Sequence, residues 1–242
     1  MSAPAMPGGI SVSELKVYES VAPDGLRGGS PHMHLVASEA YLVVSGTGEI
    51  HSIDADGWRV TELAPGDTVW FEPGVIHRAV NRDRLHLRVV MSHAGLPEAG
   101  DAVMTFSDSV LADPERYAAA AVLPGADAPD SERLAAAERR RDQAVAGYQD
   151  LFQAGRPGVV DDVALAAFRR RAVDLVAGRA EEWRRIHDAT TGRAASTALG
   201  YLEHLVNRDA SYLDHGRIAR AATTPAYGMC GTLVTVTKEG LS

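Results

Sequence analysis

The sequence predicts a β-sandwich or β-barrel in the N-terminal part of the chain, followed by an α-helical region. Between residues 12 and 91, short apolar runs recur roughly every eight to twelve residues and are separated by Gly, Pro and Asp, a pattern typical of antiparallel strands joined by tight turns. Beyond residue 130, apolar residues recur every three or four positions, as amphipathic helices require.

The strands are expected to end where Gly, Pro or Asp interrupts the alternation of apolar and polar residues. They cover residues 12–20, 41–45, 49–53, 58–63, 68–71, 76–80 and 85–91. We expect turns at Gly46–Gly48 and at Asp54–Gly57, because glycine adopts the positive φ that tight hairpin turns need.

The strand at 85–91 has two different faces, because side chains alternate along a strand. One face is formed by Leu85, Leu87, Val89 and Met91, and we expect it to point into the interior. The opposite face carries Arg88. In the alternative orientation Arg88 would point inward, where a guanidinium can bind a substrate carboxylate.

Residues 107–130 are rich in Pro, Gly and Asp and predict a linker with one short helix at 114–122. Longer helices follow, and Asp161 or Asp162 can cap the start of the second. Their apolar faces are expected to pack against one another, the barrel or another subunit. These faces are formed by Leu134, Ala137, Val145, Tyr148, Leu151 and Phe152, by Leu165, Phe168, Ala172, Leu175 and Val176, and by Leu199, Leu202, Leu205 and Val206.

The last part of the chain, residues 229–238, is rich in β-branched residues and predicts a further strand. The resulting division of the chain is a barrel at 1–106, a linker at 107–130 and a helical region at 131–242. Arginines at 139–141 and 169–171 lie among acidic residues on the predicted helices, so we expect them on solvated faces.

Composition narrows the range of partners. The net charge of −8 disfavours binding to nucleic acid, and no apolar run reaches the roughly 18 residues of a membrane helix. The single cysteine, Cys230, cannot form an internal disulfide and is expected to be a small buried apolar residue rather than a reactive thiol. We therefore expect a cytoplasmic protein that binds a small molecule and neither nucleic acid nor a membrane.

Three histidines and one glutamate have spacings that suit a metal ion. His32 and His34 lie two residues apart, so on a strand both point to the same face. Glu39 opens the next apolar run, and His77 follows a Pro-Gly turn at the start of another strand. Three imidazoles and a carboxylate suit Fe(II), Mn(II), Ni(II), Cu(II) or Zn(II), with positions left for water or substrate.

These two segments resemble the two sequence motifs of the cupin family. The first is His-x-His, four residues, Glu, six residues, Gly from His32 to Gly46, and the second runs from Gly66 through His77 to Asn81. The resemblance implies a jelly-roll barrel. It also implies that His32, His34, Glu39 and His77 bind one divalent metal ion.

Cupins include dioxygenases, decarboxylases, lyases and isomerases, so the fold does not select the reaction. We expect an Fe(II)-type oxygenase that acts on a small oxygenated metabolite, with Tyr41 and Phe71 contacting substrate and Glu39 serving also as a proton acceptor. The alternatives are a metal-dependent isomerase, lyase or decarboxylase, and a non-catalytic metabolite sensor. A jelly roll with an added helical layer also predicts a homo-oligomer, a dimer.

Overall fold

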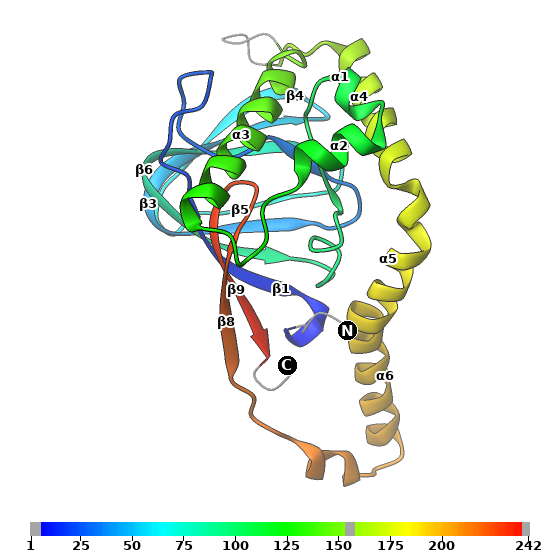
Figure 1. Cartoon of the computed structure of the whole chain (residues 1–242). Coiled ribbons are helices and arrows are strands. Elements are labelled where there is room, and N and C mark those ends of the chain that lie inside the picture. Colours follow the sequence, from blue (N-terminus) through cyan, green and yellow to red (C-terminus); the bar gives the residue numbers. More distant parts are fainter. Residues whose placement is uncertain (1–5, 153–157, 239–242) are drawn as a thin grey trace.

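The computed structural model describes residues 6–152 and 158–238. An antiparallel sheet curls into a barrel, and helices from the C-terminal half cover one side of it (Figure 1). The predicted fold class is therefore confirmed. The strands are β1 (Ser11–Val17), β2 (His32–His34), β3 (Glu39–Asp54), β4 (Gly57–Leu63), β5 (Thr68–Phe71), β6 (Ile76–Met91), β7 (Ala102–Met104), β8 (Ala221–Tyr227) and β9 (Gly231–Lys238).

Two long strands, β3 and β6, form the frame of the barrel. They pair from Glu39 opposite Met91 to Ile53 opposite Ile76. Near its start β3 also pairs with β5, and towards its end with β4; β6 pairs first with β2 and then with β1. Each long strand thus passes from one layer into the other, as in a jelly roll.

The predicted turn at Gly46–Gly48 is instead an irregular stretch within β3, where the register against β6 shifts. Gly46 has a φ of 77°, and a Cβ there would lie 2.2 Å from the backbone oxygen of Arg84. Only glycine fits this close approach with a positive φ. The chain therefore bends and continues, so four of the predicted strands merge into β3 and β6.

The predicted C-terminal strand is present as β9, which pairs antiparallel with β1 from Val12 opposite Val236 to Val17 opposite Gly231. On its other side β9 pairs with β8. A hairpin that follows the helices in sequence thereby extends the barrel sheet. The division of the chain at residues 106 and 130 stays a prediction.

The helices are α1 (Asp108–Leu111), α2 (Pro114–Ala121), α3 (Asp130–Gln149), α4 (Asp162–Val176), α5 (Ala180–His187) and α6 (Arg193–Val206), with short helical turns η1 (Pro7–Gly9), η2 (Ala177–Arg179), η3 (Asp188–Gly192) and η4 (Ser211–His215). Asp161 caps α4 as predicted, by accepting hydrogen bonds from two backbone N–H groups. One apolar core lies within the barrel, and a second lies between barrel and helices.

The arginines of α3 do not all lie on a solvated face, so that prediction is wrong for two of them. Arg140 is 8% exposed and Arg141 is 2% exposed. They share the buried side of the helix with Ala137 and Ala144, because residues three or four apart lie on one face. Two small alanines leave room there for long side chains.

Helix α6 contrasts with α3, since none of its residues is buried. Leu199, Leu202, Leu205 and Val206 are between 55% and 76% exposed, so the described chain leaves most of this apolar face uncovered. In Figure 1, α6 extends beyond the barrel, and η4 then connects it to β8. Among the described residues, no helix is both long and apolar enough to cross a membrane.

Candidate metal centre

Four side chains from three strands meet at one wall of the barrel. His32 lies on β2 directly opposite His77 on β6, with their ring centroids 4.4 Å apart. His34 follows two residues along β2, and Glu39 begins β3. One donor atom from each residue lies within 4.8 Å of all the others. Donor atoms that each bind one ion at about 2.0–2.2 Å lie at most about twice that distance from one another. The spacing in this cluster is close to that limit, so the cluster can hold a metal ion.

Hydrogen bonds fix the orientations of the three imidazole rings. His32 and His77 each direct Nδ1 at the backbone oxygen two residues earlier, at 2.9 and 3.3 Å. His34 Nδ1 lies 3.1 Å from Asp101 Oδ2. Because each Nδ1 has its own partner, each Nε2 faces the cluster, where it can bind an ion once it carries no proton. Three imidazole Nε2 atoms and a carboxylate are a donor set that fits a divalent transition metal.

The buried carboxylate of Glu39 stays ionised. Burial alone would raise its pKa, but hydrogen bonds from His34 and His77 outweigh this and hold the pKa well below its usual range. Its Oε2 lies 2.9 Å from His77 Nε2 and 3.3 Å from His34 Nε2. Burial, together with the neighbouring histidines, lowers the pKa of His32 well below its usual value. For His34, burial is outweighed by hydrogen bonds to Asp101 and Glu39, which raise its pKa to about 9. A metal ion would therefore displace a proton from His34 when it binds.

Residues 17–93, which include all four clustered residues, match the family model described as the cupin domain. This segment is a cupin domain. The cupin domain covers about a third of the chain, and the helices and the β8–β9 hairpin lie outside it. The family predicted from the two motifs is thereby confirmed.

Several solved structures are similar to part of the chain. A cupin 2 conserved barrel protein from Salinispora arenicola is 23% identical, over 41% of this chain and 76% of that one, with a TM-score of 0.30. KdgF from Halomonas is 19% identical over 38% and 74%, with a TM-score of 0.28. The lyase DddQ from Ruegeria pomeroyi, which acts on DMSP, is 24% identical over 34% and 38%, with a TM-score of 0.27. No curated protein matches the chain.

Asp101 supports the cupin cluster and was not predicted. It is fully buried, and its two carboxylate oxygens accept hydrogen bonds from His34 Nδ1 and from the backbone N–H groups of residues 35–37. It therefore holds both a histidine ring and the loop that leads to Glu39. No local pattern could reveal it, because it lies 67 residues from His34.

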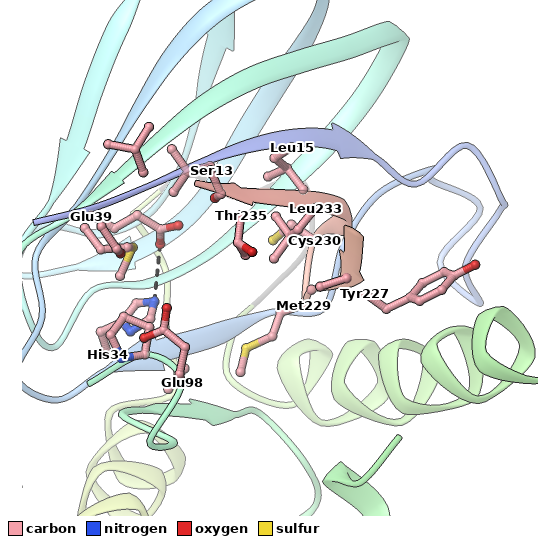
Figure 2. A pocket seen from close by; sticks show the side chains of 18 of the residues that line it. Ser13, Leu15, His34, Glu39, Glu98, Tyr227, Met229, Cys230, Leu233 and Thr235 are labelled. Carbon is pink, nitrogen blue, oxygen red and sulfur yellow. Dashed lines mark ion pairs between the residues drawn. The ribbon is translucent and has the colours of Figure 1, made fainter. Parts of the chain in front are cut away.

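The cluster opens into a cavity of about 560 Å³ inside the barrel. His32, His34 and Glu39 line this cavity, whereas His77 does not. In Figure 2, Glu39 and His34 lie opposite the hairpin residues Cys230 and Leu233. The remaining wall is largely apolar and includes Leu15, Val89, Met91 and Val236. A small molecule with an apolar portion would fit beside the cluster.

Tyr41, predicted to contact substrate, lines the cavity and is 1% exposed. Its hydroxyl donates to Cys230 Sγ at 3.8 Å, and burial raises the pKa of Tyr41 well above its usual value. The hydroxyl therefore stays protonated and can donate a hydrogen bond. Cys230 is buried, as predicted, and burial raises its pKa to about 11.

Phe71, also predicted to contact substrate, is not among the residues that line this cavity. Its ring stacks on His77 at a centroid distance of 4.4 Å and an interplanar angle of 9°, and meets Tyr41 edge-on. Phe71 thus packs behind the cluster and orients His77. Substrate contact by Tyr41 or Phe71 stays a prediction.

The strand at 85–91 turns its apolar side inward, as predicted, because Leu85, Leu87, Val89 and Met91 are all buried. Arg88 lies on the opposite, exposed face, where its Nε donates to Glu14 Oε1 at 2.9 Å. The alternative in which Arg88 binds a substrate carboxylate inside the barrel is therefore wrong.

Proposed function

We propose that this protein is a metal-dependent cupin enzyme that acts on a small molecule bound in the barrel cavity. One observation carries the proposal. Four donor atoms, from His32, His34, Glu39 and His77, lie within 4.8 Å of one another, and all of these residues except His77 line a cavity of about 560 Å³. A metal held there would have coordination positions on the cavity side, where a substrate can bind.

Among divalent ions we propose Fe(II), and among reactions the dioxygen-dependent oxidation of a small oxygenated metabolite. A mixed shell of imidazoles and carboxylate also suits Mn, Ni, Cu and Zn. When bound, the ion would supply Lewis-acid or redox chemistry to a substrate oxygen.

The protein's own residues would bind and orient the substrate. The protonated hydroxyl of Tyr41 lies in the cavity wall and would donate a hydrogen bond to a substrate oxygen. The carboxylate of Glu39 is ionised and faces the same cavity, so it would accept a substrate proton if it leaves the metal. The apolar wall would exclude water from the reacting group.

Metal analysis of protein purified without added metal tests the binding site. The wild type should contain close to one equivalent of a transition metal, and His77→Ala should lose it. His86→Ala is the matched control, because His86 lies on the same strand but pairs with Glu14 outside the cluster. Equal metal in His77→Ala and the wild type would refute the site.

Oxygen uptake by the Fe(II)-loaded protein, measured with a panel of small oxygenated metabolites, tests the reaction. Uptake that depends on a substrate supports an oxygenase. Turnover without oxygen would instead indicate an isomerase, lyase or decarboxylase. Binding of a metabolite without turnover under either condition would indicate a sensor and contradict the enzymatic proposal.

A further inference from the structure

The cavity has a cationic residue that comes from outside the cupin domain. Arg140, from helix α3, lines the same cavity as His32, His34 and Glu39. It is the only Lys or Arg among the described residues that line this cavity, and two carboxylates, Glu39 and Glu98, share the wall. The helical region thus contributes a charge to the site.

Arg140 is buried, with 8% of its surface exposed, and its hydrogen bonds are incomplete. Its guanidinium donates to two backbone oxygens, Ala121 O at 3.2 Å and Gly228 O at 2.8 Å. Its Nε is buried and has no hydrogen-bond partner. A guanidinium has five N–H donors, so three of them have no acceptor among the described residues.

The other two buried arginines of the described chain differ from Arg140 in one respect. Arg78 pairs with Asp24, and Arg141 pairs with Asp142 at 2.8 Å. No Asp or Glu of residues 6–152 and 158–238 lies within ion-pairing distance of Arg140. A buried charge without a counter-charge is unfavourable. Because Arg140 lines the cavity, a ligand bound there can supply the counter-charge.

We propose that Arg140 binds the carboxylate of the small molecule that occupies this cavity, so that the substrate is a monocarboxylic acid with an apolar portion. A guanidinium binds a carboxylate through paired hydrogen bonds. With one cationic residue and two carboxylates in the wall, a monoanion fits better than a phosphate dianion. The proposal rests on the proposed function only in that both place the substrate in this cavity.

Ligand-observed NMR titration tests the proposal with two probes of similar shape, butyrate and its neutral counterpart butyramide. The full-length protein with its metal should bind butyrate more tightly than butyramide. In Arg140→Gln this preference should fall by about tenfold or more, since hydrogen bonds to charged groups are strong. Arg139→Gln is the matched control, because Arg139 is exposed on the same helix, and should keep the preference.

Arg140→Lys keeps the charge and should retain part of the preference, which provides a measurement if Arg140→Gln does not fold. An unchanged preference in folded Arg140→Gln would overturn the proposal, as would equal binding, or no binding, of the two probes by the wild type. If the preference is lost in His77→Ala but kept in Arg140→Gln, the carboxylate binds the metal, and this result would also overturn the proposal. Metal content, measured separately, reports on the proposed function.

Discussion

Helices α3 and α6 belong to the same C-terminal region but have opposite relations to the barrel. Eight residues of α3 are buried, including Arg140 in the cavity wall, whereas none of α6 is buried. At Gly147 in α3 an added Cβ would lie 2.1 Å from the backbone oxygen of Thr105, while at Gly200 in α6 nothing lies within 4 Å. The helical region therefore contains one part that completes the cupin cavity and another that extends away from it.

Removal of a large buried side chain from α3 should give the largest effect. Tyr148 is 1% exposed and packs in the core between barrel and helices, so Tyr148→Ala should lower the free energy of unfolding by about 3–5 kcal/mol. Tyr201→Ala in α6, where the side chain is 47% exposed, should cost less than about 1 kcal/mol. Urea unfolding of both variants measures the difference, and equal losses would contradict the contrast between the helices.

The two glycines give a sharper comparison, because the same substitution should have opposite signs. Gly147→Ala forces α3 away from Thr105 and should destabilise the protein by about 1–3 kcal/mol. Gly200→Ala should stabilise it by up to about 1 kcal/mol, since alanine is the better helix former. Thermal unfolding monitored by circular dichroism checks both, and a stabilised Gly147→Ala would show that α3 does not approach the barrel this closely.

Substitution of Asp101 tests whether hydrogen bonds from outside the cluster support metal binding. Asp101→Asn puts an amide NH₂ where one oxygen now accepts two hydrogen bonds, so His34 and the loop after it should lose their fixed positions. We expect metal affinity to fall by about 10–100-fold, measured by competition with a chromophoric chelator. Asp83→Asn, at an exposed position, should leave the affinity unchanged, and equal affinity in both variants would deny Asp101 its positioning role.

Substitutions on the exposed face of α6 should have the smallest effect on the stability of the chain. Leu202 is 55% exposed, so Leu202→Glu should change the free energy of unfolding by no more than about 0.5 kcal/mol. If this face forms the predicted homodimer, the same variant should shift the mass measured by analytical ultracentrifugation from dimer to monomer. A wild type that sediments as a monomer would contradict the predicted dimer.

Prediction from sequence succeeded where the determining physics is local. His32 and His34 share a strand face because side chains alternate, and Asp161 caps α4 through its own neighbouring N–H groups. The predicted strand boundaries were wrong at Gly46, because a turn and a bulge have the same sequence signal. The close approach of Gly46 to the backbone of Arg84 in β6, far away in sequence, decides between the two.

The sequence by itself determined the cupin motifs, the inventory of possible ligands and the order of strands followed by helices. Only the tertiary structure brought His32 opposite His77, placed Asp101 behind His34 and carried Arg140 to the cavity beside Gly228, 88 residues further along the chain. The reason is that alternation and helical periodicity report on neighbours a few residues apart. Contacts across tens of residues depend on how the sheet closes and on which helix covers it.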